Sequence, residues 1–274
     1  MMGTSTWRHL ELHDTPPIMA AMDVDYREGS TIGWNLHRRG LLFCAIEGVM
    51  IARSEEGLWI VPPGRALWGA VGFDVKMSGQ AKIRTVLIDS ETIQRFPARS
   101  CVIDVSPLLR ELIVAAVRIP LDYEKDGRDN RLMRLLADEV LASDVLALHL
   151  PLPVDPRLKS ACEEIASCPS DSATANDWAK RLNVTARTIH RLFVRETGMT
   201  FVQWREQARL MFAIQGLANG ERVADIAVKC GYTSQSAFTA MFRRHFGKPP
   251  SEFYRWRCRQ GQRHFGRCVI PGDC

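Results

Sequence analysis

The sequence predicts an α+β protein of two domains, an N-terminal antiparallel β-barrel with following helices and an all-helical C-terminal domain. Three observations predict this fold class. Short apolar runs alternate with Gly and Pro up to about residue 96, and helical periodicity begins after Ser106. One helical pattern then occurs twice within residues 174–254. At 274 residues the chain is long enough for two domains that each bury a core.

Short strands are predicted in the N-terminal region, over about residues 7–96. Apolar runs at 41–46, 49–52, 58–61 and 83–88 have strand length. Turn-forming stretches interrupt them, among them Glu47-Gly48 and Pro62-Pro63-Gly64. Strands this short and closely spaced predict a small antiparallel sandwich or barrel.

Helices are predicted from residue 106 to residue 143. Ser106 is a suitable N-cap, and Pro107 occupies the first turn. A second helix over 130–142 carries its leucines on one stripe with charges opposite. Three prolines within 149–156 then prevent a helix and favour an extended connector. We therefore divide the chain into a domain over 1–150, a linker over 151–156 and a helical domain over 157–255.

The repeated pattern consists of a short helix, a tight turn and a longer helix. In both copies the turn residue follows an alanine by four positions, and a glycine follows a phenylalanine by five. The first copy has Ala179, Asn183, Phe193 and Gly198, and the second has Ala227, Gly231, Phe242 and Gly247. This pattern predicts helix-turn-helix units over 174–197 and 223–246. Because the second helix of such a unit fits the DNA major groove, we expect double-stranded DNA as a partner.

The charge distribution agrees with a nucleic-acid partner without requiring one. From Arg157 onward there are 19 basic and 10 acidic residues, a net charge of +9. The preceding residues carry 17 basic and 21 acidic residues, a net charge of −4. This asymmetry is expected of a nucleic-acid-binding domain fused to a different domain, although an ordinary basic surface explains it equally well.

Membrane insertion, export and metal binding find no support in the sequence. There is no apolar run of about 18 residues, and residues 1–7 lack the apolar part of a signal peptide, so we expect a cytoplasmic protein. The eight cysteines form no Cys-x-x-Cys pair and have no histidine at zinc-finger spacing. We interpret them as reduced thiols, and we expect neither a metal nor a cofactor.

Residues 157–255 resemble the AraC/XylS-type DNA-binding domain. The residues that carry the resemblance are Trp178-Ala179, 187–193, Glu196-Thr197-Gly198, Trp204-Arg205, Ile226-Ala227, Gly231-Tyr232, Ser236-Ala237-Phe238, Phe242-Arg243-Arg244, Phe246-Gly247 and Pro250. The resemblance implies a sequence-specific transcription regulator, most often an activator that contacts RNA polymerase. It also implies an N-terminal domain that responds to a small molecule or partner, and a homodimer formed through the helices over 106–143. The alternative is that these helices only cover the barrel of their own subunit.

The N-terminal region more loosely resembles the cupin-like sensor domain of such regulators. Gly29, Gly48, Gly64 and Gly72 keep the spacing of the two cupin motifs. Metal-binding cupins would have histidine, glutamate or glutamine, and histidine at the positions of Asn35, Leu41 and Val75. His37 alone cannot hold a catalytic metal, which takes three or more protein ligands. A cupin-type enzyme with an accessory nucleic-acid-binding module is therefore the weaker alternative.

A barrel without a metal can still admit a small molecule. We predict polar and aromatic pocket walls at Trp34, His37, Arg38, Arg39 and Trp68. The alternative is that these residues belong to the core or to the surface.

The two units predict different contacts with DNA. Core positions such as Ile189, Phe193, Phe238 and Phe242 lie on one face of each longer helix, and the opposite face is free for bases. Base-reading candidates are Arg187, His190 and Arg191 in the first unit and Gln235, Ser236 and Thr239 in the second. Phosphate-contacting candidates are Arg195, Arg243, Arg244 and Lys248. A basic tail over 256–274 adds non-specific phosphate contact or nothing.

A helix predicted over 200–217 joins the two units. Its length is roughly 25–28 Å, which suits two reading helices held about one duplex turn, roughly 34 Å, apart. One subunit is therefore expected to read two successive segments of the major groove.

Overall fold

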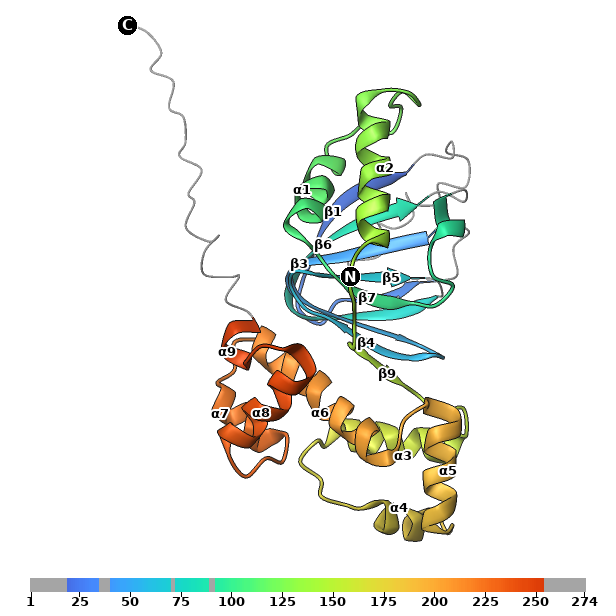
Figure 1. Ribbon diagram of the computed structural model, residues 1–274, viewed down its shortest axis with the longest axis vertical. Coiled ribbons are helices and arrows are strands. Elements are labelled where there is room, and N and C mark those ends of the chain that lie inside the picture. The colour runs from blue at the N-terminus through green and yellow to red at the C-terminus, as the bar shows by residue number, and fades with distance from the viewer. Residues whose placement is uncertain (1–18, 35–39, 70–71, 89–91, 254–274) are drawn as a thin grey trace, which may run out of the picture.

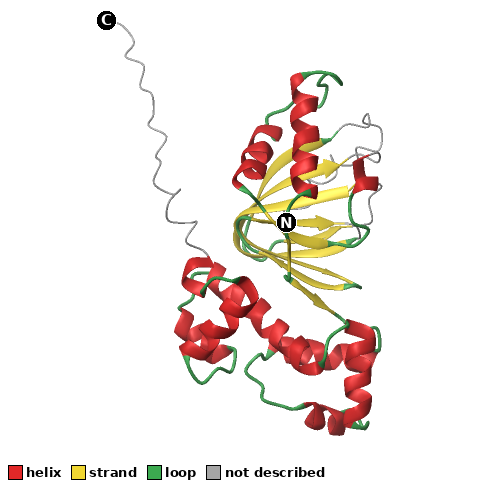
Figure 2. Ribbon diagram, in the orientation of Figure 1, coloured by secondary structure: helices red, strands yellow, loops and turns green. Residues whose placement is uncertain are grey.

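The computed structural model describes residues 19–34, 40–69, 72–88 and 92–253. An antiparallel sheet with two covering helices forms the N-terminal region, and the C-terminal region is entirely helical (Figure 1, Figure 2). This arrangement confirms the predicted fold class. The basic tail, which begins after residue 255, lies outside the described residues.

Nine strands form the sheet in the described part of the chain. They are β1 (Ala20–Tyr26), β2 (Thr31–Trp34), β3 (Gly40–Ser54), β4 (Gly57–Val61), β5 (Arg65–Gly69), β6 (Phe73–Ile88), β7 (Cys101–Asp104), β8 (Val145–Leu146) and β9 (His149–Pro151). The strand order is β1-β6-β3-β5-β7-β8, with β2 added to β6 and with β4 placed between β3 and β9. The described pairings do not join β1 to β8, so within them the predicted barrel stays open.

The prediction of separate strands at 41–46 and 49–52 is wrong. Strand β3 runs through 15 residues, and its register with β6 shifts between Ala45 and Glu47 and again between Glu47 and Val49. Gly48 has φ +70°, and a Cβ there would lie 2.3 Å from the backbone oxygen of Gln80. Glu47-Gly48 therefore forms an irregularity that bends the strand without ending it.

The two faces of the sheet belong to different apolar clusters. Leu41 and Phe43 point into the interior of the curved sheet, whereas Leu42 and Cys44 point to the outer side. Helices α1 (Pro107–Ala116) and α2 (Arg128–Leu141) cover that outer side, and a short 3-10 helix, η2 (Thr92–Arg95), lies before β7. The Ser106 hydroxyl accepts a hydrogen bond from the backbone N–H of Leu109, which confirms the predicted cap.

The helical region has two groups of helices joined by α6 (Phe201–Ala218). The first group contains α3 (Pro156–Ser167), α4 (Ala175–Arg181) and α5 (Ala186–Thr197). The second group contains α7 (Val223–Lys229), α8 (Gln235–Phe246) and α9 (Pro250–Phe253). Figure 1 shows α6 running beneath the sheet from one group to the other. No helix in the described ranges is long and apolar enough to cross a membrane.

The segment between the two regions is bonded on both sides. Strand β9 pairs with β4, with Leu150 opposite Leu58. From α6, the indole Nε1 of Trp204 donates to the carbonyl oxygen of Pro151 at 2.7 Å, and the Gln207 amide donates to the carbonyl oxygen of His149 at 3.2 Å. The chain is extended here, as the prolines predict, but it is fixed between the sheet and α6.

Candidate nucleic-acid interface

Both repeated units make the same turn between their two helices. Asn183 has φ +53° and Gly231 has φ +75°, the left-handed conformation predicted for both positions. Ala179 and Ala227 are 3% and 1% exposed, where a larger side chain would push the helices apart. These four residues fix how each longer helix projects from its unit.

The reading helices, which we define as α5 and α8, have matching ends. The Thr185 hydroxyl caps the N-terminus of α5, and the Ser234 hydroxyl caps that of α8. Both helices end at a left-handed glycine, Gly198 or Gly247. The N-terminal turn of a recognition helix is the part that contacts base edges, and the two caps fix where that turn begins in α5 and α8.

One face of each reading helix is buried, as predicted. Ile189 and Phe193 of α5 are at most 1% exposed, as are Phe238 and Phe242 of α8. The Phe193 ring packs edge-on against Phe201 of α6 with centroids 5.3 Å apart. This packing directs the opposite face of each reading helix to the surface.

The exposed face of α5 carries three side chains that can donate hydrogen bonds to bases. Arg187, His190 and Arg191 are all exposed. Within the described residues none of the three has an ion-pair or hydrogen-bond partner. Two guanidinium groups one helical turn apart match the acceptors of guanine.

The first two turns of the exposed face of α8 carry no charge. Gln235 and Ser236 are exposed at its first turn, and Thr239 is half-buried one turn later. An amide and two hydroxyls can bond to bases, but they lack the charge-assisted bonds of the first unit.

The four predicted phosphate contacts divide into two kinds. Arg195 pairs with Glu196 at 2.6 Å, and Arg244 pairs with Glu206 of α6. Arg243 and Lys248 are exposed, and no pair is recorded for either within the described residues. The paired arginines must loosen a contact to reach a phosphate, so Arg243 and Lys248 are the stronger candidates.

Glu196 also holds the start of α3, which the sequence did not indicate. Its Oε2 atom accepts the backbone N–H groups of Val154 and Asp155 at 3.1 and 3.0 Å. Burial acts to raise the pKa of Glu196, but the hydrogen bonds from Asp155 and Arg195 outweigh it and lower the pKa. An ionised Glu196 therefore ties the end of α5 to the linker.

Of the predicted effector-pocket residues, Trp68 alone has its side chain within the described part of the chain. His37, Arg38, Arg39 and the side chain of Trp34 lie outside the described residues. Trp68 is 1% exposed and packs in the cluster beneath α1 and α2, where its Nε1 donates to the carbonyl oxygen of Pro97. Its ring therefore lies on the outer side of the sheet, away from the interior. Leu41 and Val75, at two cupin ligand positions, are core residues.

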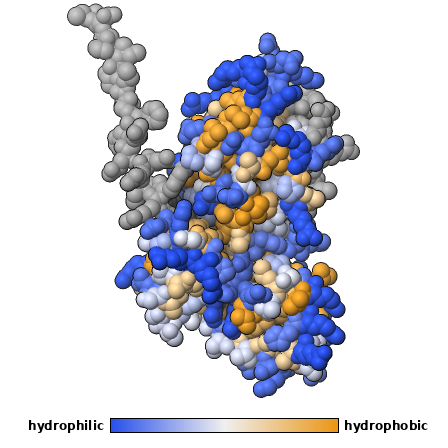
Figure 3. All heavy atoms as spheres, in the orientation of Figure 1, coloured by the Kyte–Doolittle hydropathy of each residue, from blue (hydrophilic) through white to orange (hydrophobic). Residues whose placement is uncertain are grey.

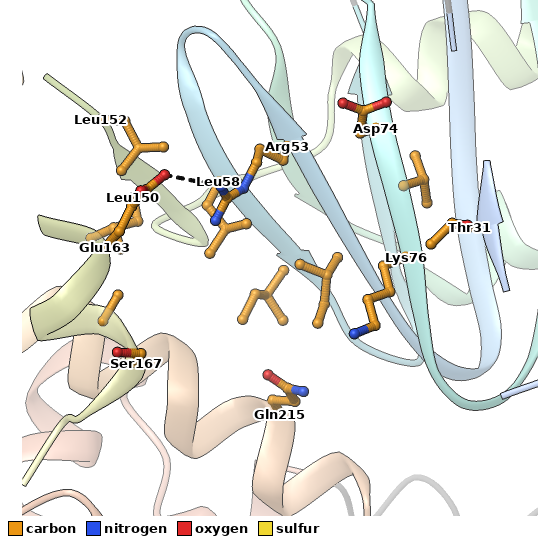
Figure 4. A pocket seen from close by; sticks show the side chains of 14 residues that line it. Thr31, Arg53, Leu58, Asp74, Lys76, Leu150, Leu152, Glu163, Ser167 and Gln215 are labelled. Carbon is orange, nitrogen blue, oxygen red and sulfur yellow. Dashed lines mark hydrogen bonds and ion pairs between the residues drawn. The ribbon is translucent and has the colours of Figure 1, made fainter. Parts of the chain in front are cut away.

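A groove that the sequence did not reveal lies between the sheet and the helical region. It has a volume of about 630 Å³. Its lining comes from β2, β3, β4, β6 and β9 on one side and from α3 and α6 on the other (Figure 4). Ile51 and Gln215 both line it. These residues are far apart in the sequence, so no local spacing pattern could predict that they line one groove.

Comparison with known proteins agrees with this geometry. A family model described as "Helix-turn-helix domain" matches residues 178–255. The transcriptional regulator NimR of Escherichia coli is 32% identical over 219 residues, which are 79% of this chain and 80% of NimR. The chain belongs to the AraC-type family of transcriptional regulators.

Shorter matches accompany NimR. The transcriptional activator RhaS of Escherichia coli is 27% identical over 49% of this chain and 51% of its own. A crystal structure from Chromobacterium violaceum, titled as a regulator with an AraC-type DNA-binding domain, is 26% identical. It covers 39% of this regulator and 96% of that chain, with a TM-score of 0.35.

We expect Gly231→Ala to lower the free energy of unfolding of this regulator by roughly 1–3 kcal/mol, because alanine is strained at φ +75° and the site is crowded. A Cβ there would lie 3.1 Å from a guanidinium nitrogen of Arg209. Gly220→Ala is the matched control, since Gly220 has φ +82° and no atom within 4 Å of an added Cβ. Urea unfolding of both variants measures the difference, and equal losses would show that crowding contributes nothing.

Proposed function

We propose that one subunit reads two successive major-groove segments of promoter DNA through α5 and α8. The observation that carries this proposal is the pair of capped reading helices, each with a buried and an exposed face, on either side of α6. Arg187, His190 and Arg191 select guanine-containing sequence in one segment. Gln235, Ser236 and Thr239 read the other segment with less discrimination, while Arg243 and Lys248 contact phosphates.

Sequencing the fragments that the purified protein retains from its own genome tests this proposal. We expect a shared motif of two short segments whose centres lie about one helical turn apart, with protection of both in a footprint. Retention of DNA without a shared motif would contradict sequence-specific reading. Protection of one segment alone would contradict the use of both reading helices.

We further propose a homodimer formed through α1 and α2. Leu108, Leu121 and Leu135 on or between these helices are 50%, 49% and 44% exposed, and Figure 3 shows apolar surface over this part of the N-terminal region. An apolar patch of this kind on a soluble domain favours contact with a second subunit. We accordingly propose that the domain before residues 151–156 senses the effector and dimerises, and that the domain after them binds DNA.

Leu135→Glu is expected to convert the dimer to a monomer, because it places a carboxylate in the apolar contact. Light scattering coupled to size exclusion measures the mass. Arg134→Glu is the control, because it introduces the same side chain about 100° around α2. A wild-type protein that is monomeric at all concentrations, or a Leu135→Glu variant that remains dimeric, would refute this interface.

We propose that the groove between the sheet and the helical region binds the effector. Half of the residues that line it are aliphatic, and the other half are polar or charged. Figure 4 shows Lys76 reaching from β6 toward Gln215 of α6, while Arg53 pairs with Glu163 of α3 at 3.1 Å. Within the described residues the Lys76 ammonium has no ion-pair partner. Aliphatic lining residues together with an unpaired cation fit a small amphipathic molecule with an acidic group.

The compound 4-phenylbutyrate is expected to raise the melting temperature, whereas 4-phenyl-1-butanol, with the same apolar body and no charge, should raise it less. Lys76→Met should remove the difference between the two compounds. Lys82→Met is the control, because Lys82 lies on the same strand but pairs with Asp23 and Asp25 outside the groove. Equal shifts for acid and alcohol, or a Lys76→Met variant that responds like wild type, would refute the acidic class of ligand.

We propose that the output is activation of transcription through RNA polymerase, as the name of RhaS as an activator supports. We also propose that the protein acts in the cytoplasm and has no enzymatic role. Metal analysis of the purified protein tests the second point. Stoichiometric iron, manganese or zinc would favour the alternative function of a cupin-type enzyme.

A further inference from the structure

The loop over residues 168–173, between α3 and α4, is fastened to α6 by two arginines. The Arg205 Nη1 atom donates to the carbonyl oxygen of Ala173 at 2.9 Å. From Arg209, Nε donates to the carbonyl oxygen of Pro169 at 2.8 Å and Nη2 donates to that of Asp171 at 3.3 Å. Because the arginines are four positions apart on one helix, they lie one above the other, and together they hold both ends of the loop.

The same loop reaches the turn of the second unit. A Cβ on Gly231 would lie 3.1 Å from the Cα atom of Ser170 and 3.2 Å from its carbonyl oxygen. The Arg209 guanidinium lies 5.8 Å from the centre of the Tyr232 ring, and the Cys230 thiol donates to the Arg209 carbonyl oxygen at 3.5 Å. Arg209 therefore contacts the loop that leads into the first unit and the turn of the second unit at once.

The guanidinium group of Arg209 makes two of these bonds from different nitrogen atoms of one planar group. Burial lowers the pKa of Arg205, and the neighbouring charge of Arg209 lowers it further. The carboxylate of Asp171 acts in the opposite direction and raises the pKa of Arg205. An apolar side chain at position 209 would leave the carbonyl oxygens of Pro169 and Asp171 without these donors, and a lysine cannot replace the rigid fork of the guanidinium group.

We propose that Arg209, supported by Arg205, fixes the spacing and the relative rotation of the two reading helices. Each unit packs on its own part of α6, and the loop over 168–173 adds a third contact that bridges them. Arg209 is thus a positioning residue that sets the distance between the two DNA segments the protein accepts. This inference rests on the proposed use of both reading helices.

The experiment measures how strictly the protein requires one spacing between the two segments. The probe is a labelled duplex selected by the wild-type protein from a random-sequence library, compared with the same duplex carrying one inserted base pair between the segments. Each inserted pair rotates the second segment by about 34°. We expect the insertion to weaken wild-type binding by about tenfold or more. For Arg209→Met we expect a loss below about threefold, from an affinity for the original duplex that is already reduced.

Two further variants keep the comparison interpretable. Arg209→Lys retains a cation beside Tyr232 and is expected to tolerate the insertion as Arg209→Met does, which covers the case in which methionine prevents folding. Arg222→Met is the control for a lost surface cation, because Arg222 is exposed near the second unit and does not contact the loop. In this variant the inserted base pair should weaken binding as much as it does in the wild-type protein.

The outcomes separate this inference from the function on which it rests. If variants of Arg209 fold and lose as much affinity on insertion as the wild-type protein does, the positioning role is overturned. The use of both reading helices would then still stand. If the insertion does not weaken binding by the wild-type protein, the use of both reading helices is refuted, and this inference with it.

Discussion

Arg191→Ala is expected to weaken binding to the selected operator by about 1–3 kcal/mol, and to relax sequence preference at one position of the first segment. Arg191 is exposed on α5 with no ion-pair partner within the described residues, so removing its side chain disturbs no other contact there. The Arg187→Ala variant should behave alike at a neighbouring base. The double variant should lose roughly the sum, 2–6 kcal/mol, if the two bases are read independently.

Competition binding against a library of single-base variants of the operator measures this loss position by position. Arg243→Ala is the matched control, because Arg243 is an exposed arginine of α8 assigned to phosphate. It should weaken binding to all sequences about equally. The slope of the logarithm of the binding constant against the logarithm of salt concentration should fall in magnitude by about one. An Arg191→Ala variant that bound the operator as tightly as wild type would refute the assignment of the α5 face.

The helical units were predictable because their determinants are local. Asn183 and Gly231 mark turns through their tolerance of positive φ, and Ala179 and Ala227 precede them at a fixed spacing. The separation of core and surface faces on α5 and α8 follows from helical periodicity alone. These features need no knowledge of the rest of the chain.

The features that could not be predicted from the sequence depend on contacts between distant segments. Gln215 of α6, which lines the groove, donates to the Ser78 hydroxyl of β6 across 137 positions. The Arg244–Glu206 pair, which occupies a predicted phosphate contact, likewise joins two helices. Strand β3 was divided wrongly because a Glu-Gly pair reads as a turn, whereas pairing with β6 on both sides of it keeps the strand continuous.

Trp204→Ala is expected to lower the free energy of unfolding by about 3–5 kcal/mol, the cost of a large cavity in a packed core. Trp204 is fully buried, and its ring packs edge-on against Phe193 of α5 with centroids 5.9 Å apart. Its indole also holds the carbonyl oxygen of Pro151. One side chain therefore supports α5, α6 and the linker, and urea unfolding followed by circular dichroism measures the loss.

Trp204→Phe separates the packing from the hydrogen bond. Phenylalanine keeps much of the ring volume but leaves the half-buried Pro151 carbonyl oxygen without its donor, at a cost of about 1–3 kcal/mol. Hydrogen exchange should then accelerate in β9, because this strand pairs with β4 and is also bonded by side chains of α6. Unchanged exchange in β9 would mean that pairing with β4 alone fixes the linker. Faster exchange confined to β9 would show that the hydrogen bond from Trp204 of α6 helps to hold this strand.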